Sequence, residues 1–429
     1  MHWSALPALA LAVLWAVATT VGPFSDTTVN DLFVYRTYAD LLADGGLPYV
    51  DFGFEYPPLA ALPIGLAGLP GRDEVTYAVT FAVLMAGCAL VGQQLAARLA
   101  GLPAAAEPAA DSPARGDRRA GLAVAWLLAL QPVLIGASLR THFDPLPIAI
   151  ALGGLLAFAR ERPELGFVLL GLGTMTKLFP GLLAVVAVVW LVARGERRAA
   201  LRGTAIFVGV VVLISLPLAG HGYVESFRFH LDRPVQIEST PASVLFALGD
   251  SQVTGTNLRP DRFKSNGLDG GHAQLVAALF AGALVLALAG VMALAARGRD
   301  VRHLVLSGFA ALLAFVTLGK VFSPQYVIWL APFAALAWVW RERIVALLTA
   351  GAIVLTQVEF PSRYFDLINE QTDVIAIVAV RNALLLTALA VLAVALAGGG
   401  ARGSSPALQP AELCPEGRKR TKDRPLRDS

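Results

Sequence analysis

The sequence predicts an all-α membrane protein that crosses the bilayer about twelve times. The chain has 429 residues, of which 56% are hydrophobic and 15% are charged, and its mean hydropathy is +0.64. Long apolar runs recur along it, and no polar region between them is long enough to form a soluble domain. The two cysteines, Cys88 and Cys414, are too few for a disulfide framework. These observations favour a single polytopic domain.

The predicted crossings are apolar runs bounded by charged residues, glycine or proline. They comprise residues 4–23, 75–99, 120–138, 145–160, 165–179, 181–194, 203–219, 273–296, 303–319, 326–340, 344–358 and 374–397. Residues 57–70 are apolar but short and contain Pro63, so we expect a re-entrant or interfacial segment there. Residues 1–398 would then form one transmembrane domain, and residues 399–429 a disordered, basic cytoplasmic tail.

The basic residues indicate the orientation in the membrane. If both termini are cytoplasmic, 22 of the 34 Lys and Arg residues fall in inner loops and the tail, as expected from the enrichment of these residues in cytoplasmic loops. Two long loops, residues 24–56 and 220–272, then lie outside. We therefore expect a multi-pass protein of the plasma membrane with its site facing outward.

The first outer loop concentrates acidic and aromatic side chains. Leu32, Tyr35, Ala39 and Leu42 recur at helical spacing, which predicts a short amphipathic helix lying on the membrane surface. Asp31 falls in its first turn, and the Gly45-Gly46 pair stops it. A carboxylate is thereby placed at the outer surface, although Asp31 acting only on the helix dipole is a structural alternative.

Polar residues at the outer ends of later spans are expected on the same face. They are Arg140, His142 and Asp144, then Lys177, and then Lys320, Gln325 and Tyr326. Ionisable groups at membrane depth are costly, so each needs a partner or a function. The structural alternatives are basic side chains reaching the interface and an ion pair between Arg140 and Asp144, which are four residues apart.

An outward carboxylate near cations suits the transfer of a sugar from a lipid-linked phosphate. The carboxylate can take the proton of the acceptor hydroxyl, an effect worth about 10² to 10⁴ in rate, and cations can stabilise the departing phosphate. Lys177, Lys320 and Arg140 are the candidates for the phosphate. A transporter or lipid-linked sugar flippase, and a lipid-linked polymerase or ligase, are the alternatives; the lack of an internal repeat argues against transport.

Four segments resemble the GT-C membrane glycosyltransferases, and within them glycosyltransferase family 87. They read NDLFVYRTYADLLADGGLPYVDFGFEYPP, RTHFD, KLFP and SPQYVIWLAPF. That family contains actinobacterial alpha-mannosyltransferases that use polyprenyl-phosphate mannose, and related arabinofuranosyltransferases. The resemblance implies an inverting hexosyltransferase of the cell envelope, with mannose favoured over arabinofuranose and a glycolipid or polysaccharide as acceptor.

The resemblance also implies roles for particular residues. The loop of residues 24–56 would be catalytic, with Asp31 as the general base and Asp26 as the less favoured choice. We expect the sugar and acceptor to contact Glu55, Tyr56, His142, Asp144, Gln325 and Tyr326. A histidine contributes in some relatives, and the outward candidates are His142, His221, His230 and His272. We expect no metal, nucleotide sugar or other cofactor, because neither a D-x-D motif nor a Gly-rich phosphate loop occurs.

Overall fold

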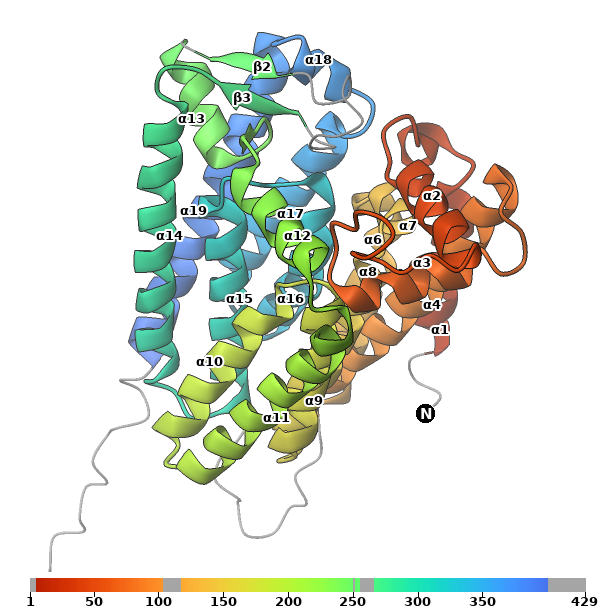
Figure 1. Ribbon diagram of the computed structural model, residues 1–429. Coiled ribbons are helices and arrows are strands. Elements are labelled where there is room, and N and C mark those ends of the chain that lie inside the picture. The colour runs from red at the N-terminus through yellow and green to blue at the C-terminus, as the bar shows by residue number, and fades with distance from the viewer. Residues whose placement is uncertain (1–4, 103–116, 250, 255–265, 400–429) are drawn as a thin grey trace, which may run out of the picture.

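The computed structural model describes residues 5–102, 117–249, 251–254 and 266–399. Helices make up most of it, and many of them run lengthwise through the molecule (Figure 1). The expected tail from residue 400 onward and most of the inner loop at residues 103–118 lie outside the described residues.

The N-terminal part of the chain, as far as residue 193, forms helices and two short 3-10 turns. They are α1 (Ala5–Ala18), η2 (Gly22–Ser25), α2 (Leu32–Ala43), η3 (Pro58–Ala60), α3 (Ala61–Ala67), α4 (Glu74–Ala100), α5 (Arg118–Ala129), α6 (Gln131–Leu134), α7 (Ser138–Thr141), α8 (Pro145–Ala159), α9 (Pro163–Thr176) and α10 (Pro180–Ala193). Helix α8 packs against both α4 and α9. The residues before α8 lie beside the start of the chain, since Arg140 donates to the Phe24 and Ser25 carbonyls.

The C-terminal part adds further helices and three short strands. They are α11 (Arg197–Ser215), η4 (Leu216–Leu218), α12 (His221–Asp232), β1 (Val235–Gln236), α13 (Thr240–Leu248), β2 (Gln252–Thr254), β3 (Gly267–Asp269), α14 (Ala273–Ala295), α15 (Val301–Leu318), η5 (Pro324–Tyr326), α16 (Val327–Val339), α17 (Arg343–Glu359), α18 (Tyr364–Ile368) and α19 (Thr372–Gly399). Helix α19 packs against α17 and α15.

Each range that the sequence predicts to cross the membrane contains a helix. Five helices of the described chain are long and apolar enough to cross by themselves. They are Glu74–Ala100, Arg197–Leu218, Ala273–Ala295, Val301–Leu318 and Thr372–Gly398. A multi-pass membrane protein is therefore supported, whereas the number of twelve crossings and the membrane-surface position of α2 stay predictions.

The stretch between α12 and α14 departs from the expected all-α class, because it contains a small antiparallel sheet in the order β1-β3-β2. Val235 pairs with Leu268, which also pairs with Val253. Val235 and Leu268 belong to a separate hydrophobic cluster, which includes Phe360 and Tyr364 from the segment after α17. The strands have only two or three residues each, too few for an alternating pattern to show in the sequence.

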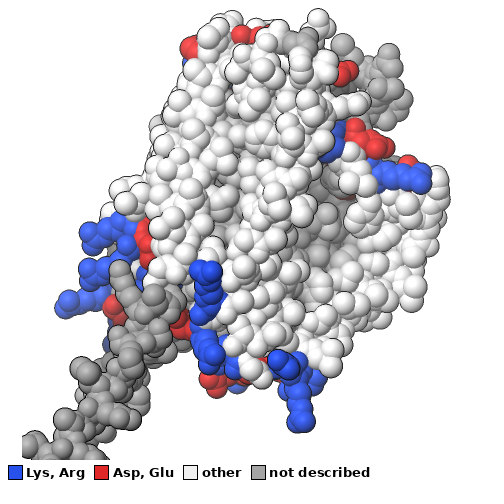
Figure 2. Space-filling view, turned by 90° about the vertical axis from the view of Figure 1, so that its left-hand side faces the viewer, with Lys and Arg blue, Asp and Glu red and all other residues white. Residues whose placement is uncertain are grey.

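Charged side chains are unevenly distributed over the surface. In Figure 2, Lys and Arg gather at the lower part of the molecule, below a broad surface that carries almost no charge. Arg194 follows α10 and Arg302 belongs to the first turn of α15, and they form ion pairs with Glu196 and Glu342. An uncharged band above a basic end is the pattern expected of a membrane protein, although the orientation itself stays a prediction.

Candidate active site

Asp31 stands directly before α2, at its N-cap position. Its side chain makes no capping hydrogen bond; instead the Asn30 side-chain oxygen accepts from the Leu32 amide at 2.8 Å. The glycine stop is as expected, since Gly45 has a φ of +87° and Gly46 donates to the Leu41 carbonyl at 3.0 Å. Because Asn30 takes the capping function, the Asp31 carboxylate is left for other partners.

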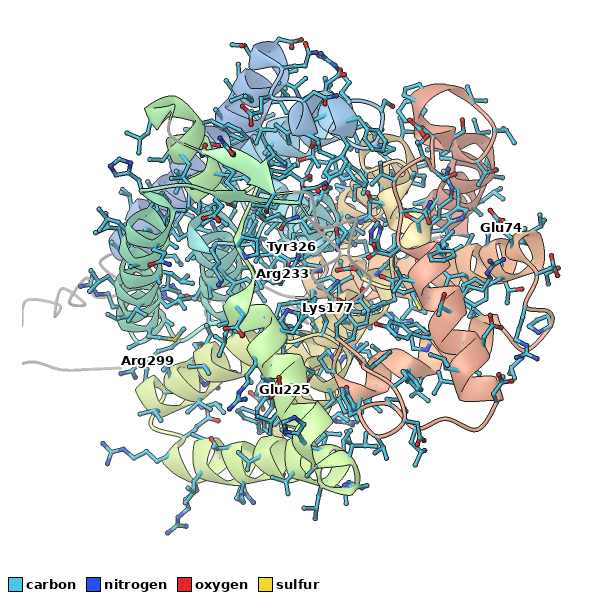
Figure 3. All side chains as sticks on the ribbon, turned by 45° about the horizontal axis from the view of Figure 1, so that its top comes forward. Glu74, Lys177, Glu225, Arg233, Arg299 and Tyr326 are labelled. Atoms are coloured by element: carbon cyan, nitrogen blue, oxygen red, sulfur yellow. The ribbon has the colours of Figure 1, made fainter. Side chains whose placement is uncertain are left out.

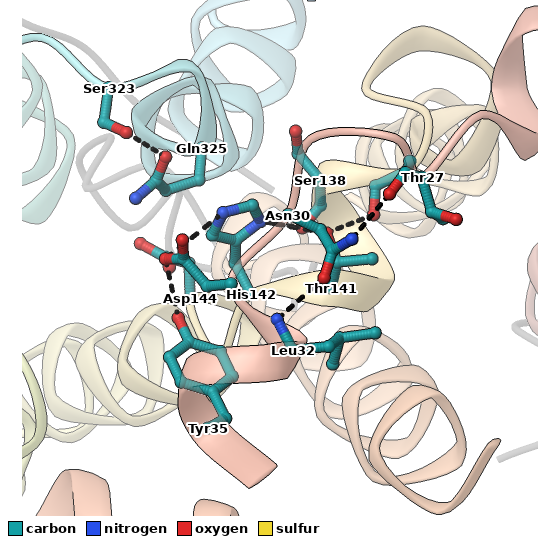
Figure 4. A network of polar contacts seen from close by, with 12 residues as sticks. Thr27, Asn30, Leu32, Tyr35, Ser138, Thr141, His142, Asp144, Ser323 and Gln325 are labelled. Carbon is teal, nitrogen blue, oxygen red and sulfur yellow. Dashed lines mark hydrogen bonds and ion pairs between the residues drawn. The ribbon is translucent and has the colours of Figure 1, made fainter. Parts of the chain in front are cut away.

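Those partners are Tyr35, one turn along α2, and His142, which follows α7. The Tyr35 hydroxyl donates to Asp31 Oδ2 at 3.2 Å, and His142 Nε2 lies 3.5 Å from the same oxygen. Figure 4 shows the His142 ring between this contact and Ser138 and Thr141 of α7. The Asp31 side chain keeps 34% of its surface exposed while His142 keeps 3%. A substrate can therefore approach the carboxylate but not the imidazole.

The hydrogen bonds around His142 fix which ring nitrogen carries a proton. Nδ1 lies 3.2 Å from the Ser138 carbonyl and 3.1 Å from the Thr141 hydroxyl. The Thr141 hydroxyl donates its hydrogen to the Ala137 carbonyl, so Nδ1 faces two acceptors and must be the donor. Nε2 is then the ring nitrogen that faces Asp31 Oδ2.

Asp144, two residues after His142, forms a buried ion pair. Lys177 Nζ lies 2.7 Å from Oδ1 and 2.8 Å from Oδ2, and Trp329 Nε1 donates to Oδ1 at 2.5 Å. Asp144 is fully buried and the Lys177 side chain is 13% exposed. The Lys177 ammonium also lies over the rings of Phe143 and Tyr326, at 4.8 and 5.9 Å. The partner of Asp144 is thus Lys177 from α9, and the expected alternative pair with Arg140 does not form.

The other two predicted phosphate ligands bind backbone carbonyls. Arg140 is buried and donates to the carbonyls of Phe24 at 2.8 Å and Ser25 at 3.0 Å. Lys320 donates to the carbonyls of Leu231 and Arg233, where α12 ends. Cations often satisfy the free carbonyls at helix ends in this way. Arg140 therefore anchors the segment before α2, and Lys320 anchors the end of α12.

The predicted sugar-binding residues lie around the same space. Tyr326 stacks on Trp329 with ring centroids 4.0 Å apart, and the Ser323 hydroxyl donates to the Gln325 side chain. The Tyr56 ring packs edge-on against Phe143 at 5.1 Å. Glu55 contributes its carbonyl to His230 Nε2 at 2.8 Å. The structure thus brings both outer loops and the start of α16 to one site.

Sequence reasoning missed Arg233, which follows α12. Lys177, Arg233 and Tyr326 lie close together near the centre of Figure 3. Burial lowers the pKa of His230, and the charges of Arg233 and Lys177 lower it further, against the effect of its bond to Glu55. The two cations therefore share one electrostatic environment. A signal existed, since Arg233 is a basic residue in an expected outer loop, but nothing local distinguished it from Arg228.

The carboxylate of Asp26, the alternative base, already accepts three hydrogen bonds. Its Oδ1 accepts from the Thr28 amide at 2.9 Å and the Thr28 hydroxyl at 2.6 Å, and its Oδ2 accepts from Ser362 at 2.9 Å. These bonds, chiefly that of the Thr28 hydroxyl, lower the pKa of Asp26. A carboxylate stabilised in its charged form is a weak proton acceptor.

The family model of glycosyltransferase family 87 matches residues 54–324, more than half of the chain. Asp31 precedes the matched range. A search of curated protein sequences found no match.

Two solved structures are similar in fold to this chain. ArnT from Cupriavidus metallidurans, crystallised with undecaprenyl phosphate, aligns with a TM-score of 0.45 and 16% identity, over 94% of this chain and 79% of its own. The oligosaccharyltransferase of Archaeoglobus fulgidus, crystallised with a tethered acceptor peptide, aligns with a TM-score of 0.42 and 13% identity, over 92% of this chain and 55% of its own.

The family match covers the stretch from Phe54 to Pro324, which includes the His142, Asp144, Lys177 and Arg233 positions. The chain belongs to glycosyltransferase family 87.

Proposed function

We propose that this glycosyltransferase transfers mannose from a polyprenyl-phosphate donor to a glycolipid or polysaccharide acceptor at the outer face of the plasma membrane. The observation that carries the proposal is the partly exposed Asp31 carboxylate, held by Tyr35 and His142. Tyr35 packs on the Phe143 ring, over which the Lys177 ammonium lies at 4.8 Å. A base for a hydroxyl and cations for a phosphate are the two requirements of this reaction.

In the proposed reaction, Asp31 accepts the proton of the acceptor hydroxyl as the oxygen attacks the anomeric carbon of the sugar. The bond between that carbon and the phosphate oxygen breaks on the opposite side, so the configuration inverts. Polyprenyl phosphate leaves with an additional negative charge, which Lys177 and Arg233 stabilise. His142, with a hydrogen on Nδ1 directed at Ser138, holds the carboxylate in place through Nε2.

The remaining predicted residues have supporting roles in this proposal. Lys320 sets the end of α12 and thereby the position of Arg233, and Arg140 sets the segment that leads to Asp31. Tyr326 and Tyr56 offer aromatic surfaces on which a sugar ring can pack. Asp144 keeps Lys177 in place, which limits the net positive charge that the phosphate meets.

The proposal is tested by incubating the purified protein with polyprenyl-phosphate mannose that carries a radiolabel on the sugar, in the presence of envelope glycolipid extract. We expect label to move to the acceptor and unlabelled polyprenyl phosphate to appear in equal amount. Movement of the intact labelled lipid across a proteoliposome membrane without release of polyprenyl phosphate would contradict transfer and favour a flippase. Polyprenyl-phosphate arabinofuranose as the better donor would correct the sugar.

A further inference from the structure

Three charged side chains are buried together beneath the small sheet, away from Asp31. Glu238 follows β1, Glu359 ends α17, and Arg381 belongs to α19; each is 1% exposed. Arg381 donates through Nη2 to the Glu238 carbonyl and through Nε to Asn382 at 3.2 Å. The burial of any one of these charges without a compensating charge would be strongly unfavourable. Their charges must therefore balance one another.

The hydrogen bonds of this cluster are incomplete. Gln236 Nε2 donates to Glu238 Oε2 at 2.9 Å. Among the described residues, Glu238 Oε1, both carboxyl oxygens of Glu359 and Arg381 Nη1 have no hydrogen-bond partner. Arg381 Nη2 thus binds a backbone carbonyl and Nε binds a side-chain amide. Its Cζ atom lies 4.0 Å from the centroid of the Phe322 ring. The guanidinium does not satisfy both carboxylates.

The charges do not balance either. Two carboxylates face one guanidinium, and the neighbouring phenols Tyr364 and Tyr326 are neutral. Arg233 also acts on Glu238, but it is the weakest of the charges that do so. Burial raises the pKa of Glu238 well above its ordinary value, and Glu359 raises it further. One negative charge therefore remains to be neutralised.

The space around the cluster limits what can neutralise it. The unpartnered carboxyl oxygens are enclosed by protein. A proton bound to one of the two carboxyl groups removes the excess negative charge.

We propose that Glu238 and Glu359 form a proton-binding site, in which the folded protein holds one carboxylate, one carboxylic acid and Arg381 at zero net charge. Two interacting carboxyl groups of this kind titrate as a pair. Arg381 and Asn382 of α19 donate hydrogen bonds to the Glu238 carbonyl. With its charges balanced by the proton, the cluster holds residues 235–240 in place.

A consequence for the donor rests on the proposed function. Arg233 lies five residues before Glu238, and Arg381 contacts Phe322, which stacks on Tyr326 at 6.2 Å. Loss of the proton would leave both Glu238 and Glu359 negatively charged, and their repulsion would act near Arg233 and Tyr326. Weaker donor binding at alkaline pH is therefore expected, although the proton site itself can be tested without any transfer assay.

The test uses the full-length protein in lipid nanodiscs, with thermal unfolding followed by tryptophan fluorescence from pH 7 to 9, above the range in which His230 titrates in the unfolded chain. The folded pair binds its proton more tightly than the unfolded chain does, so its stabilisation is present at acid pH and is lost as the pH rises. We expect the wild-type Tm to fall over this range. Glu359→Gln and Glu238→Gln each need no proton to balance Arg381, so each should remove this fall and raise the Tm at pH 9 by roughly 1 to 3 °C.

Three comparisons complete the experiment. The double variant leaves Arg381 uncompensated and should be less stable than either single variant. The control Glu225→Gln, in an exposed pair with Arg228, should keep the wild-type profile. The infrared carbonyl band of a protonated carboxyl group should be present in the wild type near neutral pH and absent in Glu359→Gln. Single variants that are less stable than the wild type at every pH, with no such band in the wild type, would overturn the proposal.

Discussion

The Asp144–Lys177 pair offers a prediction whose size follows from its geometry. Asp144→Asn preserves shape and lets Trp329 still donate to a side-chain oxygen, but it removes the charge that Lys177 contacts at 2.7 and 2.8 Å. Lys177 then remains largely buried without a counter-charge. Breaking a buried pair in this way costs about 3 to 5 kcal/mol. The Phe143 ring, 4.8 Å from the ammonium, offsets part of that, about 1 to 2 kcal/mol.

We therefore expect Asp144→Asn to lower the free energy of unfolding by about 1 to 4 kcal/mol. The measurement is unfolding of the purified protein in mixed micelles with increasing SDS, followed by tryptophan fluorescence. Adding Lys177→Met should cost about 1 to 3 kcal/mol less than the sum of the two single changes. The control Asp40→Asn, in an exposed pair with Arg72, should cost about 0 to 1 kcal/mol. An Asp144→Asn protein as stable as this control would refute the buried-pair account.

Two other predictions concern α12 and the residue after it. Burial lowers the pKa of His230, so the folded chain binds fewer protons than the unfolded chain; stability should fall as the pH drops below about 6.5, and thermal unfolding of His230→Gln should show a smaller fall. Arg233→Gln should raise the KM for the lipid donor by about tenfold or more, which corresponds to about 1.4 kcal/mol, with an unchanged Tm. A normal KM would remove Arg233 from the phosphate site.

The sequence predicts those features that depend on residues close together in the chain. The density of acidic and aromatic residues identified the first outer loop, and the alternation of apolar and polar positions with Gly45-Gly46 predicted the extent of α2 within one residue. The glycosyltransferase family was likewise indicated by four short segments, and the family match supports it. The roles assigned to individual residues stay predictions.

Partners distant in the sequence could not be predicted. The Arg140–Asp144 pair, a structural alternative, depends on their spacing of four residues, but α7 ends at Thr141 and His142 is extended, with φ of −126° and ψ of 147°. The two side chains therefore point to different partners. Glu238 precedes Glu359 and Arg381 by more than 100 residues, and each of the three occurs in a segment with no local motif. Only the packing of α17, α19 and the small sheet brings them together.

The central claim, that Asp31 is the general base, is tested most directly by Asp31→Asn. This change keeps the size and the hydrogen bond with Tyr35 but removes the ability to accept a proton. Sugar transfer should fall by about 10² or more while binding of the donor lipid is retained. Asp44→Asn, at the exposed end of the same helix, should transfer sugar at the wild-type rate. An Asp31→Asn enzyme that transfers sugar as fast as Asp44→Asn would contradict the assignment.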